Sequence, residues 1–332
     1  MSFRSVLAAV LLTASGTLSA FSGPTPPPAK PTVILFVGNS FFHGAFQPVL
    51  SYNAAAITDE NYERNGKGQR RHQYEHREGP WGGIPGIFKK LTDEAGLNYE
   101  VHLEAISGQT LKFHYDSALA VIQQPQWDKV VMHDYSTGPV PTRHGGYPTR
   151  FAEYANRLEK AIHQANPRAQ VYLYETWARA DQSYTPKGGY AGLPVDSMTS
   201  DLHRAYYREV AQNGHMAGVA PAGDAWLRAI ETGVAMRNPY QPTASKINLW
   251  GRDNYHPSQW GAYLNACVLF GEITGRDPRQ LGAKEQAAAD LGIAPEQAVA
   301  LQRVAYEQLQ AAQKQEGSKK KKKEKSRKKQ KS

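Results

Sequence analysis

The stretch that decides the fold is VILFVGNSFFHG, residues 33–44. It begins with a continuous apolar run, 33–37, which is typical of a strand buried on both faces of a parallel sheet. Gly38 and Asn39 then supply turn residues, and Ser40 follows them. Ligands of open α/β sheets bind at the carboxyl ends of the strands. The stretch therefore predicts a buried first strand that presents Ser40 at the functional edge of a sheet.

Strand and helix patterns alternate along the rest of the chain as far as residue 275. Further strands are expected at 98–107, 127–136, 169–177 and, weakly, 215–223. Amphipathic or apolar helices are expected at 83–96, 110–124, 149–167, 201–214 and 257–275. Alternation of this kind implies right-handed crossovers and helices on both faces of the sheet. We expect an α/β protein, a three-layer α/β/α sandwich around a central parallel sheet of five strands.

The two ends of the chain differ in composition from its body. Residues 1–22 place Arg4 before a short apolar run that ends in small residues. This pattern predicts a secretory signal peptide, too short for a membrane span, rather than the alternative of an N-terminal helix of the mature protein. Residues 23–31 form a proline-rich spacer, so the folded domain is expected at 32–313. The expected location is secreted or periplasmic.

The positive charge of the protein is concentrated at its C-terminus. Residues 314–332 hold 11 basic and 2 acidic residues, so this segment accounts for the whole net charge of +9. A block of like charges is predicted to be a disordered lysine-rich tail. The tail either binds an anionic envelope surface or only aids solubility. It has no interleaved aromatic residues, and no specific nucleic-acid partner is predicted.

The sequence gives little reason to expect a metal or an organic cofactor. Its one cysteine, Cys267, lies in an apolar helical pattern and is interpreted as a core residue. His72 and His76 are four residues apart, as metal ligands on a helix can be, but their segment is very polar. We interpret that segment as a solvated loop and predict no metal site and no cofactor.

Two residues near the C-terminus complement Ser40 chemically. A serine hydroxyl needs a base within hydrogen-bond reach, and the base needs a group that orients it. Asp253 and His256 stand three residues apart just before the helix that Pro257 opens. A turn at this point can bring the carboxylate to the imidazole. The alternative is that Asp253 and Ser40 only cap turns and helices.

The motifs around these residues are similar to those of the SGNH, or GDSL-type, hydrolase superfamily. GNSF (38–41), SGQTL (107–111) and DNYHPS (253–258) resemble its first, second and last blocks, and the likeness extends over about residues 32–278. With ETWAR (175–179), they look especially like a poorly characterised bacterial branch.

This resemblance implies a flavodoxin-like fold and a serine esterase that hydrolyses short acyl esters, often acetyl groups on carbohydrates. It assigns Ser40 as the nucleophile, His256 as the base and Asp253 as the residue that orients it. The backbone N–H groups of Ser40 and Gly108 would form the oxyanion hole.

Two positions depart from the pattern of the superfamily. Asn39 replaces the usual aspartate before the serine, and MHDYSTG (132–138) lacks the asparagine that normally donates to the oxyanion. His133 or Ser136 is a candidate substitute. Loss of one such donor costs about 3 to 4 kcal/mol of transition-state stabilisation. A catalytically weak or inactive ligand-binding protein of the same fold is therefore the alternative function.

Aromatic and basic residues after the fourth strand are candidates for substrate binding. Trp177 and Tyr184, with Tyr190, would form a wall for stacking sugar rings, although a tryptophan here is also typical of core packing. Arg179 would bind a substrate carboxylate or phosphate, or would lie exposed on the surface. The predicted partner is a small-molecule or carbohydrate ester.

Overall fold

The computed structural model of the chain describes residues 30–63 and 79–329, with side chains to Ser318. The predicted signal peptide, most of the spacer, and the loop with His72 and His76 lie outside the described residues. The chain divides into two compact units, Met1–Lys30 and Pro31–Ser332. The second unit is described below.

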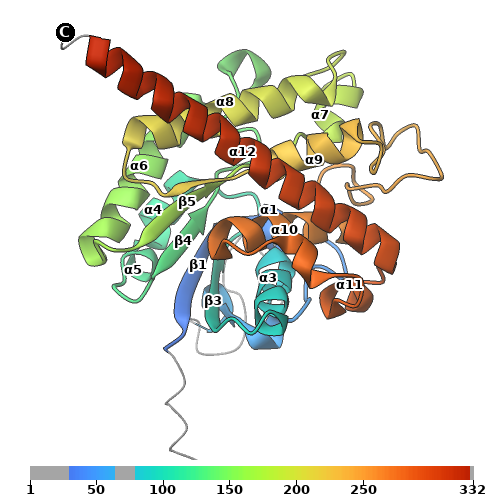
Figure 1. Ribbon diagram of the computed structural model, residues 1–332, viewed down its shortest axis with the longest axis horizontal. Helices are drawn as coiled ribbons and strands as arrows, with labels where there is room; N and C mark the ends of the chain where they lie inside the picture. Colours follow the sequence, from blue (N-terminus) through green and yellow to red (C-terminus); the bar gives the residue numbers. More distant parts are fainter. Residues whose placement is uncertain (1–29, 64–78, 330–332) are drawn as a thin grey trace, which may run out of the picture. The chain divides into compact units, whose positions relative to one another are not determined.

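A single parallel sheet forms the centre of this unit (Figure 1). Its strands lie in the order β2-β3-β1-β4-β5-β6. The bounds are β1 Thr32–Gly38, β2 Thr58–Asp59, β3 Tyr99–Ala105, β4 Lys129–Met132, β5 Gln170–Tyr174 and β6 Gly218–Ala220. The prediction of a parallel α/β/α sandwich is confirmed, and the prediction of five strands is wrong.

The missed strand, β2, is a two-residue segment at one edge of the sheet. Thr58 and Asp59 pair with His102 and Leu103 of β3. Asp59 is only 1% exposed, and its carboxylate accepts hydrogen bonds from the N–H groups of Asn61 and Trp81. A pair of polar residues has no apolar pattern, so the sequence could not distinguish this strand from a surface loop.

Helices cover both faces of the sheet (Figure 1). The longer ones are α3 Gly83–Glu94, α4 Leu111–Ser117, α6 Pro148–Ala165, α8 Val195–Asn213, α9 Ala222–Glu231, α10 Gln259–Thr274 and α12 Pro295–Lys329. The short ones are α1 Ser40–His43, α2 Glu60–Glu63, α5 Leu119–Ile122, α7 Ala180–Tyr184 and α11 Gln286–Asp290, with 3-10 turns at Ala54–Ala56, Thr142–His144 and Pro278–Leu281. Helices α3 and α10 pack together on one face, and α4, α5, α6 and α8 lie on the other. No helix among the described residues has the length and apolarity that a bilayer crossing requires.

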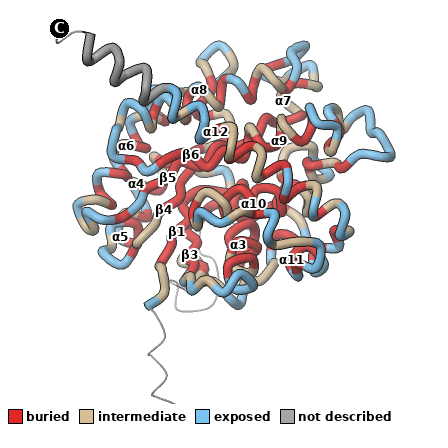
Figure 2. The backbone as a smooth tube through the Cα atoms, viewed as in Figure 1, coloured by how far each residue is buried: buried red, intermediate tan, exposed pale blue. Residues whose placement is uncertain are grey.

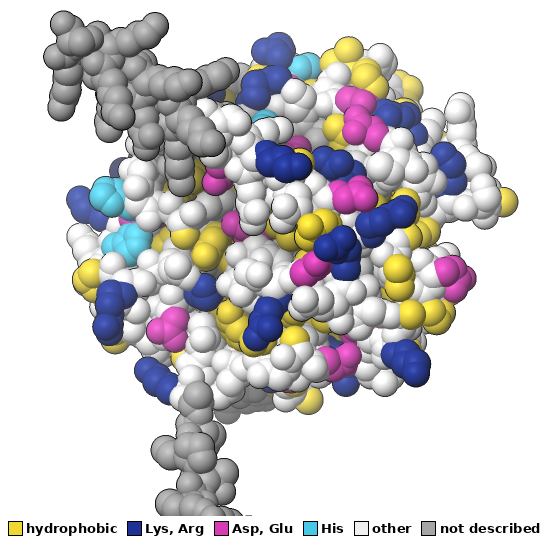
Figure 3. Space-filling model, viewed as in Figure 1, with side chains coloured by type: hydrophobic (Ala, Val, Ile, Leu, Met, Phe, Trp, Pro, Cys, Tyr) yellow, Lys and Arg dark blue, Asp and Glu magenta, His cyan; other side chains and the backbone are white. Residues whose placement is uncertain are grey.

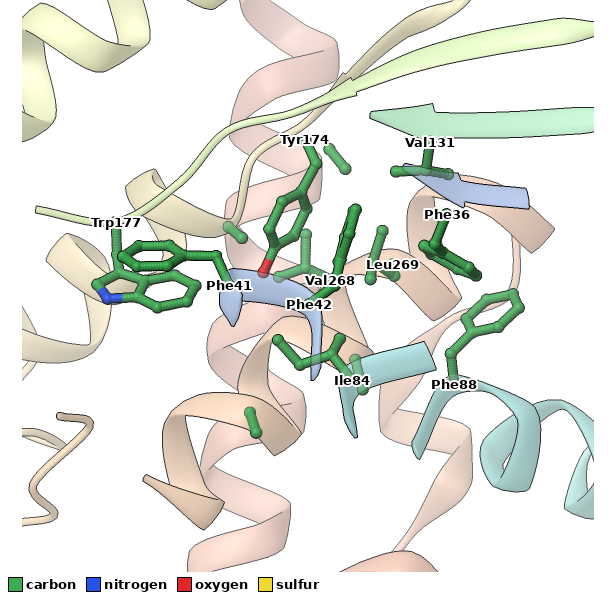
Figure 4. Packing of buried hydrophobic residues seen from close by; sticks show 14 of the residues in the cluster. Phe36, Phe41, Phe42, Ile84, Phe88, Val131, Tyr174, Trp177, Val268 and Leu269 are labelled. Carbon is green, nitrogen blue, oxygen red and sulfur yellow. The ribbon is translucent and has the colours of Figure 1, made fainter. Parts of the chain in front are cut away.

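Buried residues run through the sheet and the inner sides of the helices (Figure 2). Residues 34–37 of β1 are fully buried, as the apolar run predicts. One of them, Phe36, forms edge-to-face pairs with Phe42 and Phe88, with ring centroids 5.3 and 5.7 Å apart, respectively (Figure 4). The rigid core therefore extends directly to the end of β1. On the surface, basic and acidic side chains are interspersed over the face shown in Figure 3.

The C-terminal helix differs from the prediction for residues 314–332. The structure continues α12 to Lys329 instead of beginning a disordered tail at residue 314. Leu301, Val304 and Ala305 anchor the first half of α12 in the core. Extending an existing helix is far easier than nucleating one, and alanine, glutamine, glutamate and lysine are good helix formers. The charge block therefore did not indicate where the helix ends.

Candidate active site

The site is built where the order of the strands reverses. Strand β1 lies between β3 and β4, so the connections on its two sides run in opposite directions and leave a crevice at its carboxyl end. Gly38 pairs with Ala105 at the end of β3, and Val37 pairs with Met132 at the end of β4. The segments that follow all three strands therefore meet around Ser40.

Ser40 is the first residue of α1, and it does not cap this helix. The cap is Asn39, whose side-chain oxygen accepts from the N–H of Phe41 at 3.1 Å. The amide nitrogen of Asn39 donates to the carbonyl of Gln109 at 2.9 Å. Asn39 thus joins the turn after β1 to the turn after β3, which explains how it can replace an aspartate. The hydroxyl of Ser40 is free for other contacts.

A tight loop carries Asp253 and His256 to the same place. Gly251 donates its N–H to the carbonyl of His256 at 2.7 Å, and Asn254 takes a left-handed conformation with φ 57°. The helix that follows, α10, is capped by Ser258, whose side chain accepts from the N–H of Gly261. Asp253 therefore does not cap α10, although its carboxylate does cap the turn that leads to His256.

The three predicted residues form a hydrogen-bonded chain. Nε2 of His256 lies 2.8 Å from Oγ of Ser40, and Nδ1 lies 2.6 Å from Oδ2 of Asp253. Asp253 Oδ1 also accepts from the N–H groups of Tyr255 and His256. Partial burial acts to raise the pKa of Asp253, but these hydrogen bonds outweigh it and hold that pKa below its ordinary value. Asp253 is therefore an anion that fixes Nδ1–H on its own side of the ring and leaves Nε2 as the acceptor for Ser40.

Two backbone N–H groups near the hydroxyl of Ser40 are available as donors. The N–H of Ser40 belongs to the first turn of α1, where no acceptor exists within a helix. Gly108 lies in the turn that Ile106 and Gln109 close, has φ +71°, and is exposed. Neither N–H has an acceptor in the described part of the chain. Both are suitable donors to a developing oxyanion.

His133 is not available as an additional donor, contrary to the suggestion from the sequence. Its ring is fully buried; Nδ1 donates to the carbonyl of Asp134 at 2.8 Å, and Nε2 accepts from the N–H of Asn39 at 3.4 Å. Burial lowers the pKa of His133 to about 3, so the ring is neutral and has no second proton. It lies so close to Gly38 that a Cβ there would stand 2.3 Å from Nε2. His133 therefore supports the end of β1 by packing against Gly38 and accepting a hydrogen bond from Asn39.

Arg179 and Ser136 form a buried network instead of contacting solvent. Arg179 is 8% exposed, binds the carboxylate of Asp181 through Nε and Nη2, and donates through Nη1 to Oγ of Ser136 at 3.2 Å. Its guanidinium also stacks over the ring of Tyr255 at 3.6 Å. The prediction of an exposed arginine is wrong, because a neighbouring carboxylate and an aromatic face compensate the buried charge. Since Asp181 binds one edge of the guanidinium and Nη1 donates to Ser136, Arg179 is a support for the Tyr255 loop.

Trp177 is a core residue rather than part of a substrate wall. It is fully buried and stacks on Phe41, with the ring centroids 4.0 Å apart (Figure 4). It also stacks on Trp226, with the centroids 4.6 Å apart. Its indole N–H donates to the carbonyl of Tyr255 at 3.1 Å. Trp177 thus connects the residue after Ser40 to the residue before His256.

The two tyrosines of the proposed wall, Tyr184 and Tyr190, have their contacts elsewhere and do not extend a surface from Trp177. Tyr190 is 1% exposed, stacks on His144 and donates to Asp201. Tyr184 is half-buried and donates its hydroxyl to the carbonyl of Arg237 at 3.0 Å. No sugar-stacking wall is formed by these residues.

A cavity of about 690 Å³ lies against the loop that carries Asp253 and His256. Phe46 lies between this cavity and the site, with its ring edge-to-face to His256 at 6.2 Å and under Arg252 at 4.2 Å. Among the lining residues are Gln47, Leu50, Asn248, Gln259 and Trp260. This cavity was not predicted from the sequence. Nothing in FQPVL (46–50) indicates a position beside residue 256.

Comparison with solved structures finds several chains of similar fold. The chain matches a DUF4886 family protein from Bacteroides uniformis with a TM-score of 0.52 and 17% identity, over 84% of this chain and 95% of that one. It also matches a putative GDSL-like lipase from Parabacteroides merdae (TM-score 0.45, 17% identity, 74% and 96% covered). A third match is the acetylxylan esterase Axe2 from Geobacillus stearothermophilus (TM-score 0.45, 14% identity, 73% and 94% covered).

The first of these matches shows that the two chains share a fold, and at such identity it shows the fold alone. Proteins described as GDSL-like lipases and esterases are among the matching structures, the class that the sequence motifs resemble. No protein-family profile matches the sequence. No curated protein matches it either.

Proposed function

We propose that this protein is a serine ester hydrolase. Ser40 Oγ attacks the carbonyl carbon of an ester while Nε2 of His256 takes the hydroxyl proton. The resulting imidazolium lies beside the anionic Asp253. The observation that carries the proposal is the continuous hydrogen-bonded chain from Ser40 through His256 to Asp253, with distances of 2.8 and 2.6 Å.

The rest of the cycle follows from the same groups. When the tetrahedral intermediate collapses, the C–O bond breaks and His256 returns its proton to the departing alcohol. Water then attacks the acyl group on Ser40, with His256 again taking a proton, and the acid leaves as Ser40 regains its hydrogen. The N–H groups of Ser40 and Gly108 stabilise the oxyanion in both halves of the reaction. The cycle uses no metal and no organic cofactor.

A two-donor oxyanion hole limits the expected rate. His133 has no proton to donate, and the Ser136 hydroxyl lies buried against Arg179 and Tyr255, so we infer that the hole lacks the side-chain donor typical of the hydrolases that the motifs resemble. We expect turnover to be lower by about 10²- to 10³-fold than with a third donor. The same observation favours the second candidate function, a catalytically weak or inactive protein that binds a carbohydrate or a similar ligand with this site.

We propose short acyl esters, among them acetyl groups on carbohydrates, as the substrate class. The cavity beside His256 supports this choice because it combines aromatic rings, Phe46 and Trp260, with amide side chains that hydrogen-bond hydroxyl groups. We also propose that residues 1–22 direct export to the periplasm or the exterior. The lysine-rich segment 314–332 would then hold the mature protein on an anionic envelope surface.

Hydrolysis of p-nitrophenyl acetate tests the esterase proposal. The mature protein should turn over this ester, and Ser40→Ala and His256→Ala should each reduce the rate to that of buffer while the circular dichroism spectrum is unchanged. Ser258→Ala, which removes a helix cap close to His256, is the control and should retain most of the activity. Equal rates in the wild type and the Ser40 variant would leave the ligand-binding function as the better account.

A further inference from the structure

A second cluster of ionisable side chains lies apart from Ser40, where β5 meets α8 and α9. Glu175 directly follows β5, His203 belongs to α8, and Asp224 belongs to the first turn of α9. One ligand atom from each side chain lies within 4.8 Å of the others. The proposed esterase uses none of these three residues.

Glu175 differs from the other two because its carboxyl group is buried and one of its oxygens lacks a hydrogen-bond partner. The residue is fully buried, and Oε1 has no hydrogen-bond partner within the described part of the chain. The other oxygen, Oε2, accepts a long hydrogen bond, 3.4 Å, from the N–H of Asp224. No lysine or arginine of the described residues forms a salt bridge with Glu175 or Asp224. A buried carboxyl oxygen without a partner is costly unless a proton or a cation binds it.

The surroundings of the cluster are suited to a cation. Nδ1 of His203 lies 2.8 Å from Oδ2 of Asp224, which also accepts from Nε2 of Gln308 on α12 at 3.2 Å. Arg228, one turn further along α9, donates instead to the side-chain oxygen of Gln308. A cavity of about 270 Å³ is lined by His203 and Asp224, so solvent reaches the cluster from this side.

We propose that Glu175, His203 and Asp224 bind one divalent transition-metal ion, with Zn²⁺ as the representative. An imidazole and two carboxylates are ligands that Zn²⁺ accepts, with water completing the coordination. Two carboxylates balance the charge of the ion, and the ion supplies the missing partner of Glu175 Oε1. Gln308 would not bind the ion itself, but its hydrogen bond would orient the carboxylate of Asp224.

The competing arrangement is a proton in place of the metal. Burial and the neighbouring carboxylate of Asp224 both raise the pKa of Glu175 well above its ordinary value, so a protonated Glu175 is the metal-free state. Zn²⁺ would have to displace this proton, and its binding would strengthen as the pH rises. Metal titration therefore distinguishes the two arrangements.

The position of the cluster indicates a structural role for the ion. Helix α9 packs against both α8 and α12 (Figure 1). An ion on Glu175, His203 and Asp224 would join the end of β5 to α8 and α9, and Gln308 would extend this link to α12. Binding to the folded state alone raises the unfolding temperature as the free metal concentration rises above the dissociation constant. The inference does not rest on the esterase proposal.

Isothermal titration calorimetry of the full mature chain, without a histidine tag, tests the site with Zn²⁺. The wild type should bind one ion with release of protons. His203→Ala and Glu175→Gln should each weaken binding at least about ten-fold, or 1.4 kcal/mol. His215→Ala, which removes an exposed histidine just after α8, is the matched control and should leave binding unchanged.

Thermal unfolding and cobalt spectroscopy keep the test independent of activity. Zn²⁺ should raise the unfolding temperature of the wild type and of His215→Ala, but not that of His203→Ala. Co²⁺ should give visible absorption bands that His203→Ala abolishes. Wild-type protein that folds but binds no Zn²⁺, or binds it equally well after the His203 and Glu175 substitutions, would overturn the proposal and leave the protonated Glu175.

Discussion

Replacing Gly38 with alanine should damage both stability and activity, because the ring of His133 occupies the place of the new methyl group. A Cβ at position 38 would stand 2.3 Å from Nε2 and 2.6 Å from Cδ2 of that ring. Carbon atoms and their neighbours normally pack about 3.5 to 4.0 Å apart. The ring cannot yield easily, since it is fully buried, bonded through both nitrogens and packed edge-on against Phe42 at 4.5 Å.

The size of the effect follows from what must move. Overpacking a rigid core costs about 1 to 3 kcal/mol. Breaking a buried hydrogen bond of His133 adds about 1 to 3 kcal/mol. We therefore expect Gly38→Ala to lower the free energy of unfolding by about 2 to 6 kcal/mol. Ser40 is only two residues from position 38. If the substitution displaces the Ser40 hydroxyl by about 1 Å, ester hydrolysis should also fall by about 100-fold.

Urea unfolding of Gly38→Ala, of His133→Ala and of the double variant measures this interaction directly. If the ring is the obstacle, the alanine at 38 should cost much less stability in the His133→Ala background. Gly96→Ala is the matched control: φ is +67° and a Cβ there meets no atom within 4 Å, so only about 1 kcal/mol of backbone strain is expected. An equal cost of Gly38→Ala in both backgrounds would refute the reasoning.

Three further predictions concern the residues around the site. Asp253→Asn should keep the fold but lower kcat for p-nitrophenyl acetate by about 10²- to 10⁴-fold, because an amide no longer holds the imidazole in the required tautomer; an unchanged kcat would show that Asp253 has no such role. Trp177→Phe removes the donor to the carbonyl of Tyr255, so chemical denaturation should show a loss of about 1 to 3 kcal/mol, with reduced turnover; full stability and activity would contradict the loop-support role. Burial depresses the pKa of His133 to about 3, so its stabilising contribution is complete above pH 6.5 and is lost as the pH falls toward 3. The free energy of unfolding of the wild type, relative to His133→Gln, should therefore fall by about 3 kcal/mol between pH 6.5 and 4; parallel pH profiles of the two proteins would refute this.

The sequence was sufficient for the parts of the fold that have a regular pattern. The apolar run of β1, the alternation of strands and helices, and the residue types Ser40, Asp253 and His256 are all local features of the chain. The structure brings these three side chains together because β1 and the start of α10 meet at the same edge of the sheet.

Features that depend on distant partners were beyond the sequence. Arg179 looks like a surface residue until Asp181, Ser136 and Tyr255 are known to surround it. His133 looks like a possible donor until its two nitrogens are seen to be used within the core. In both cases a polar side chain is buried because a specific partner compensates it, and such partners leave no periodic signal in the chain.

Labelling with a fluorophosphonate tests the central claim, an activated serine at position 40, most directly. Mass spectrometry of the folded mature protein should find one adduct, located on Ser40, with no labelling of Ser40→Ala and much slower labelling of His256→Ala. Folded wild-type protein that stays unlabelled, or that carries the adduct on another residue, would contradict the claim.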